Sequence, residues 1–83
     1  MSANTDTEGN DMNELVYILE AAQEHKELAD MWFDLYSKSN DRTDWEMVMN
    51  EQGMCDGLLK AYEIVSGKKI FGFEIKDELA AIA

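Results

Sequence analysis

The 83-residue sequence contains no proline, one cysteine and one histidine. Without proline, nothing forbids long helices, because proline removes a backbone donor and clashes with the preceding helical turn. The single cysteine, Cys55, excludes an internal disulfide framework, so packing must stabilise the fold. One histidine and one cysteine cannot assemble a zinc site within one chain. These absences favour a helical protein without a metal or another cofactor.

Catalytic motifs are missing as well. No carboxylate stands three residues before His25, so the Glu-x-x-His pattern of helical di-iron proteins is absent. No glycine-rich loop precedes a Lys-Ser/Thr pair, which excludes a nucleotide P-loop. Cys55 stands among Met54, Leu58 and Leu59, where a cysteine is usually a small inert hydrophobe. We therefore expect no enzyme, with no catalytic and no cofactor-binding residues.

Targeting segments are not evident in the sequence. Residues 1–10, MSANTDTEGN, lack the basic start and apolar centre of a signal peptide. No apolar run approaches the length of a membrane span. We expect a cytoplasmic protein in which residues 1–10 form a disordered acidic tail and residues 11–83 a single helical domain.

Basic residues are few, which makes charge the strongest feature of the composition. Eighteen acids stand against seven bases, for a net charge of −11. Residues 1–34 hold nine of these acids and only Lys26, so this part carries −8. Affinity for nucleic acid comes from cations that displace counterions, so we expect neither direct nucleic-acid binding nor docking on an anionic membrane. The expected partner is a protein with a basic surface.

Two long segments have the composition of helices. Residues 12–37 are nearly all good helix formers, and Asp11 and Glu14 fit a helix start. Residues 39–41 are typical of a loop. Thr43 and Glu46 then form a capping-box pattern, which predicts a second helix over residues 44–66 with Gly67 as its C-cap.

The C-terminal segment allows two interpretations. Hydrophobic residues alternate with others over residues 70–75, which is typical of an extended chain, although no other segment provides a partner strand. An extended arm or a short edge strand is therefore expected, followed by a final helical turn or two from Asp77. The predicted fold is mainly α, a small helical hairpin or three-helix bundle with a short extended C-terminal arm.

The first helical segment has differently oriented apolar faces in its two halves. Met12, Leu15 and Leu19 share one face, whereas Leu28 and Trp32 belong to a face turned by more than a right angle. Either the helix breaks near His25, or it continues and its two ends contact different neighbours. The expected core residues of the two helices are Leu15, Leu19, Leu28, Trp32, Leu35, Met54, Leu58, Tyr62 and Val65.

Two glycines interrupt the second helical segment. Gly53, Gly57 and Ala61 are spaced four apart, and each glycine costs about 1 kcal/mol relative to alanine in a helix. Close approach of another helix is the expected compensation. That helix belongs either to the same chain, which we favour, or to a second copy in a homodimer.

Five carboxylates form a stripe on the remaining sector of the first helix: Glu20, Glu24, Glu27, Asp30 and Asp34. Carboxylates repeated about every helical turn, ~5.4 Å, approximate the rhythm of a phosphate backbone. A solvated face that serves only solubility has the same pattern. These five residues are the predicted partner-binding site.

The chain is short, forms one domain, is strongly acidic and lacks catalytic groups. In these respects it resembles the inhibitors encoded by phages and mobile elements, some of which block CRISPR effectors by occupying a basic nucleic-acid groove. The resemblance implies a DNA-mimicking inhibitor that acts in the host cytoplasm. The alternative is a structural or adaptor module that acts through a dimer or an apolar patch. The inhibitor needs an acidic face without apolar interruption, whereas the adaptor needs an exposed methionine or aromatic patch, or a two-fold contact lined by glycines.

Overall fold

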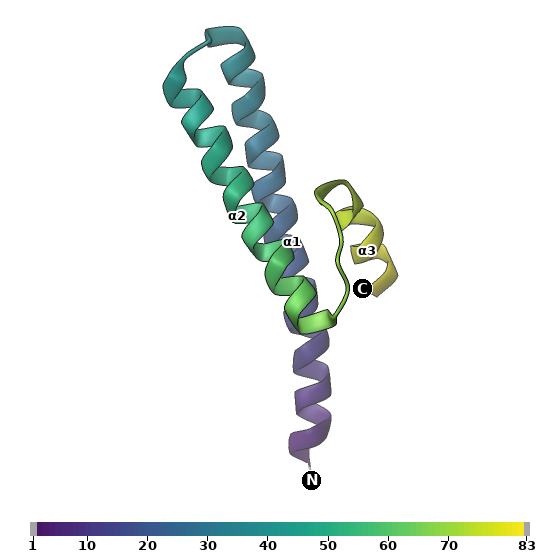
Figure 1. The fold of residues 1–83 in the computed structure, drawn as a ribbon. Helices are drawn as coiled ribbons and strands as arrows, with labels where there is room; N and C mark the ends of the chain where they lie inside the picture. The colour runs from purple at the N-terminus through teal and green to yellow at the C-terminus, as the bar shows by residue number, and fades with distance from the viewer. Residues whose placement is uncertain (1, 83) are drawn as a thin grey trace.

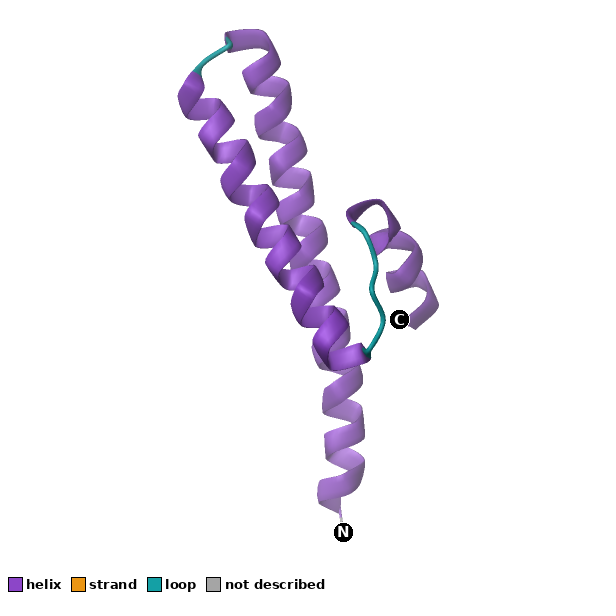
Figure 2. Ribbon diagram, in the orientation of Figure 1, coloured by secondary structure: helices purple, strands orange, loops and turns teal. Residues whose placement is uncertain are grey.

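The computed structural model describes the backbone of residues 2–82 and the side chains of residues 14–82. Two long helices, α1 (Ser2–Ser39) and α2 (Arg42–Ser66), form an antiparallel hairpin. A 3-10 turn, η1 (Gly72–Glu74), and a short helix, α3 (Ile75–Ile82), follow. Figure 1 shows α3 beside the half of the hairpin farther from the α1–α2 loop. The described residues contain no strand (Figure 2), and the predicted mainly α fold is confirmed.

Helix α1 continues through residues 23–27 without a break. This settles the choice left open at His25 in favour of one helix whose ends have different neighbours. The helix begins at Ser2 rather than at Asp11. The side chains of residues 1–13 lie outside the description, so the division of the chain at residue 11 stays a prediction.

The turn between the helices has well-defined caps. Asn40 adopts the left-handed φ of 56° that ends α1, and its amide donates to the Tyr36 carbonyl at 2.7 Å. Asp41 is the N-cap of α2 and accepts from the Thr43 amide at 2.8 Å. The predicted cap at Thr43 is therefore wrong by two positions, because the Asp41 side chain accepts from a free amide of the first turn. At the other end, Gly67 is the predicted C-cap, with a φ of 76°.

The core lies where α3 and the preceding arm cover the hairpin. Its buried residues are Leu19, Ala22, Cys55, Leu59, Tyr62, Ile70 and Ile75. Of the predicted core, Leu19 and Tyr62 are buried, whereas Leu15, Leu28, Trp32 and Leu58 are half-buried. The predictions for Leu35, Met54 and Val65 are wrong, since these residues are 41%, 44% and 50% exposed. They lie away from the side that α3 covers.

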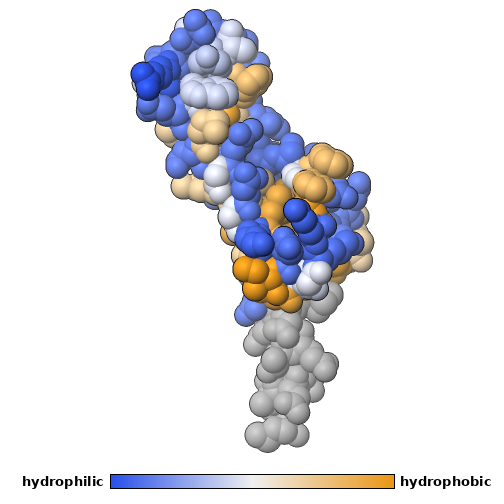
Figure 3. All heavy atoms as spheres, viewed as in Figure 1, coloured by the Kyte–Doolittle hydropathy of each residue, from blue (hydrophilic) through white to orange (hydrophobic). Residues whose placement is uncertain are grey.

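The arm and α3 are anchored by two isoleucines. Ile70 and Ile75 are buried in the core, while Phe71 and Phe73 point outward and are 53% and 78% exposed. The alternation seen in the sequence therefore marks an extended arm that ends at η1, and no edge strand forms over residues 70–75. Helix α3 begins at Ile75, two residues before the expected start at Asp77. Figure 3 shows hydrophobic residues gathered where α3 meets the hairpin, within a largely hydrophilic face.

Candidate protein-binding surfaces

The predicted stripe is present as one exposed side of α1. All five of its carboxylates are exposed. Because α1 is continuous, the stripe runs along a single axis, and at 1.5 Å per residue it is about 21 Å long from Glu20 to Asp34. This regularity depends on the unbroken helix at His25, which the sequence left open.

Neighbouring side chains reduce the charge of the stripe. Lys26 pairs with Asp30 at 3.3 Å, and Lys38 pairs with Asp34 at 3.1 Å. Each pair is exposed and contributes little to stability, at most about 1 kcal/mol. Met31, 46% exposed, lies four residues after Glu27 and three before Asp34, so it interrupts the acidic face. The expectation of an acidic face without apolar interruption is therefore met only in part.

A second surface consists of two rows of residues, which we call the outer seam. The row on α1 holds Ala21, His25, Leu28, Trp32 and Leu35, and the row on α2 holds Met47, Glu51, Met54, Leu58, Ala61 and Val65. In both rows the spacing alternates between four and three residues, which is the repeat of helices that pack along their length. Such a repeat keeps each row on one side of its helix.

Contacts across the hairpin place both rows on the same side. His25 Nδ1 lies 2.5 Å from Glu51 Oε2, which joins the α1 row to the α2 row. Lys26, one position further along α1, lies instead beside Gly72 on the side that carries η1 and α3. The outer seam therefore faces away from η1. Leu35, Met54 and Val65 in the outer seam are 41%, 44% and 50% exposed.

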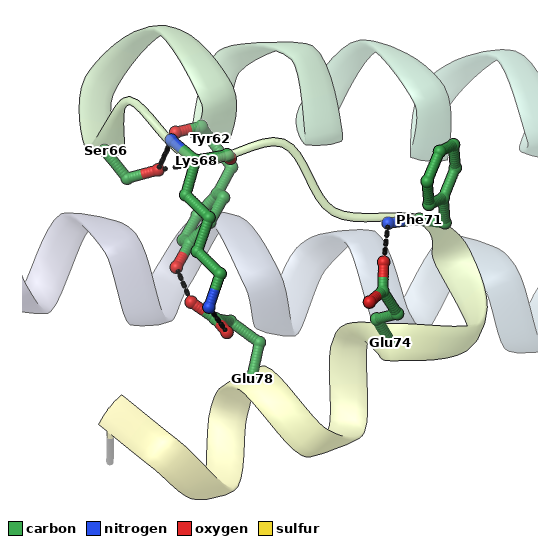
Figure 4. Close-up of polar contacts among 6 residues, drawn as sticks. All are labelled: Tyr62, Ser66, Lys68, Phe71, Glu74 and Glu78. Carbon is green, nitrogen blue, oxygen red and sulfur yellow. Dashed lines mark hydrogen bonds and ion pairs between the residues drawn. The ribbon is translucent and has the colours of Figure 1, made fainter.

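A polar cluster of the buried Tyr62 and Glu78 with the exposed Lys68 fixes α3 to the hairpin (Figure 4). The Tyr62 hydroxyl donates to the Glu78 carboxylate, and Lys68 Nζ donates to Glu78 Oε1 at 2.7 Å. The Lys68 hydrogen bond, with that of Tyr62, holds the pKa of Glu78 below its usual value. Burial and the hydrogen bond to Glu78 raise the pKa of Tyr62 to about 12. Sequence reasoning missed this cluster, because its members come from α2, the arm and α3 and share no motif.

The two glycines of α2 stand in open space. No atom lies within 4 Å of the position that a Cβ would occupy at Gly53 or Gly57. The favoured prediction, close packing of another helix of the same chain, is therefore wrong for the described residues. The predicted helix partner, α1, packs instead against the side of α2 that carries Val48, Cys55 and Tyr62.

Other chemistry is sparse in residues 14–82. No three residues among histidine, cysteine, aspartate and glutamate gather in a way that could hold a metal ion. Cys55 is buried at the edge of a cavity of about 280 Å³ beside Gly72, and burial together with Asp56 raises the pKa of its thiol. No described helix is long and apolar enough to cross a membrane.

Comparison with known proteins gave no relative. No family model, no curated protein and no solved structure matches this chain.

Proposed function

We propose that this chain is a non-enzymatic binding protein that covers a basic surface of a partner protein with the acidic stripe of α1. The observation that carries the proposal is that all five carboxylates are exposed along one continuous helix. A stripe about 21 Å long matches the length of a groove that holds several nucleotides, at about 3.4 Å per step along one strand. The partner is accordingly a nucleic-acid-binding effector, whose ligand the stripe imitates.

The role of an inhibitor follows from occupancy of such a groove. A protein that fills the groove competes with nucleic acid through the summed field of its carboxylates. The likeness in size and charge to inhibitors encoded by phages and mobile elements, including anti-CRISPR proteins, supports this role. The chain would then act in the host cytoplasm.

The test is affinity capture with matched charge variants. The immobilised chain is exposed to a lysate of the source cells, and bound proteins are identified by mass spectrometry. Simultaneous replacement of Glu27, Asp30 and Asp34 by lysine should abolish capture of the nucleic-acid-binding partner and leave helical circular dichroism intact. The control replaces Glu46, Asp56 and Asp77 by lysine, since these exposed acids lie outside the stripe and give the same change in net charge. Equal capture by both variants would refute the role of the stripe.

A second function is favoured by the outer seam. Leu35, Met54 and Val65 of the seam are exposed apolar residues, 41%, 44% and 50% exposed. An exposed apolar patch that includes Met54 is a surface that a structural or adaptor module would use. An adaptor would bind its partner through apolar contact, so its binding would persist at high salt, whereas binding through the stripe would weaken.

A further inference from the structure

We infer that the outer seam is the contact between two copies of this chain, which pair hairpin to hairpin as a four-helix bundle. The inference does not rest on the proposed function of the stripe, and it assigns the seam to a second copy rather than to the partner of an adaptor. It rests on the spacing, the exposure and the charge of the seam residues.

Spacing provides the first argument. Each long helix carries two adjacent rows with the alternating four-three repeat. The inner row of α2 holds Val48, Gln52, Cys55, Leu59 and Tyr62, and its apolar residues are buried in the hairpin and core. The outer row, from Met47 to Val65, lies one position away and has the same repeat. Helices of four-helix bundles need two such rows, because each helix contacts two neighbours. A single hairpin buries the inner row and only part of the outer row, at Glu51 and Leu58.

Exposure is the second argument. Leu28, Trp32, Met47 and Leu58 are half-buried, and three more seam residues are at least 41% exposed. On α2 the seam extends from Met47 to Val65, about 27 Å. Two helices with their axes 8–10 Å apart present a face roughly 20 Å wide, so each copy buries on the order of 500 Å² of projected area. The total of about 1,000 Å² lies at the low end for protein interfaces, in the range of weak contacts that form at high protein concentration.

Charge identifies the occupant as a second copy. The chain carries −11, yet the seam holds only two titratable residues, His25 and Glu51, and these are bonded to each other. Two strongly acidic chains can approach through the seam with less repulsion than through the stripe, which carries five carboxylates. A basic partner would find its complement on the stripe and nothing comparable on the seam.

The His25–Glu51 pair also suits a contact between copies. It lies near mid-length of the hairpin, where a polar group among apolar residues penalises shifted pairings. Glu51 is only 8% exposed even in the single chain. Contact between copies would complete the burial of the pair and fix the register of the two hairpins.

Sedimentation velocity tests the inference with variants of equal charge. The wild-type chain should sediment at twice its mass of 9.5 kDa. Met54→Lys should sediment at the single mass with unchanged helical circular dichroism. Phe73→Lys, which changes an exposed apolar residue on η1, should remain dimeric. A wild-type chain that stays monomeric at every accessible concentration overturns the inference, and so does equal dissociation of both variants.

Methionine oxidation of the wild-type protein keeps the test decisive if a variant fails to fold. Met54 and Met49 are 44% and 49% exposed, so hydrogen peroxide should oxidise them at similar rates in the monomer. Only Met54 belongs to the seam. With rising protein concentration, oxidation of Met54 should slow severalfold while that of Met49 stays constant. Parallel rates at all concentrations contradict the contact between copies.

Discussion

At the scale of single residues, Gly57 provides a direct test of open space on α2. With no atom within 4 Å of a Cβ at this position, Gly57→Ala should raise the free energy of unfolding by up to about 1 kcal/mol. Chemical denaturation monitored by circular dichroism measures this change. Gly67→Ala is the matched control and should destabilise, because Gly67 has a φ of 76°.

The opposite result at Gly57 would also be informative. A loss of stability in Gly57→Ala would show that something packs on this side of α2 in solution. The prediction from open space would then be wrong.

The lowered pKa of Glu78 predicts how the free energy of unfolding depends on pH. Its pKa is lowered by Lys68 and Tyr62, so its charged form stabilises the fold. This contribution is present above the ordinary carboxyl value near 4.5 and is lost as pH falls through the lower pKa of the folded state. Glu78→Gln should therefore cost about 1–3 kcal/mol at neutral pH. The difference in the free energy of unfolding between this variant and wild type should shrink as the pH is lowered below 4.5.

The stability of Glu78→Gln must be compared with that of wild type at each pH, because acid also protonates the other carboxylates and relieves their mutual repulsion.

Tyr62→Phe provides the complementary measurement at high pH. The pKa of Tyr62 is raised, so its contribution is complete below pH 10 and is lost as pH rises towards about 12. For Glu78, a difference in the free energy of unfolding between Glu78→Gln and wild type that does not change with pH would contradict the role of the charged carboxylate.

At the scale of elements, the sequence predicted both long helices because caps and composition are local properties. Gly67 shows this well, since a glycine after the last apolar residue of a helix marks its end. The start of α2 was misplaced by a short distance because both Asp41 and Thr43 suit an N-cap. Only the contact between Asp41 and the Thr43 amide decides between them.

Which apolar row faces inward could not be predicted in this way. Leu35 and Met54 belong to the outer row and Ala29 and Cys55 to the inner row, and both rows have helical spacing. Hydrophobicity favours leucine and methionine for the core, whereas the smaller alanine and cysteine allow the helices to approach. The packing of α1 against α2, together with the arm and α3 over the core, decides between the rows, and these contacts join residues far apart in the sequence. The exposure of the stripe residues was predicted correctly because carboxylates rarely occupy a packed face.

Helix α3 is expected to be integral to the fold despite its eight residues. Ile75 is fully buried, so Ile75→Ala should lower the free energy of unfolding by about 2–5 kcal/mol. This is a large share of the ~5–15 kcal/mol that stabilises a typical domain. Phe73→Ala, two residues away and 78% exposed, should change it by less than about 0.5 kcal/mol. Thermal melts that do not distinguish the two variants would show that α3 is detached in solution.

At the scale of the whole molecule, the stripe carries the exposed charge and the outer seam carries exposed apolar residues. The stripe occupies the exposed side of α1, and the outer seam joins both helices on a side with one internally bonded polar pair. A dimer formed through the seam would display two stripes, one on each copy. Two linked stripes raise the effective concentration at a partner with two basic sites, which increases affinity without any new contact.

Salt should therefore act in opposite directions on the two surfaces. An increase from ~0.1 M to ~1 M NaCl shortens the screening length from ~10 Å to ~3 Å. Repulsion between two chains of −11 then falls, so the dimer fraction and the melting temperature should rise. Capture of a basic partner through the stripe should weaken over the same range, because its attraction is screened as well. Sedimentation, thermal melts and affinity capture in one salt series measure all three effects.

The control for this prediction is the variant with lysine at positions 46, 56 and 77. Each reversal adds two positive charges, so the net charge changes from −11 to −5 and the repulsion between copies is smaller. Its dimer should already be favoured at low salt and should respond less to added salt. A wild-type melting temperature that falls with salt would mean that ion pairs such as Lys68–Glu78 outweigh carboxylate repulsion. Repulsion between carboxylates would then not be the factor that limits dimer formation.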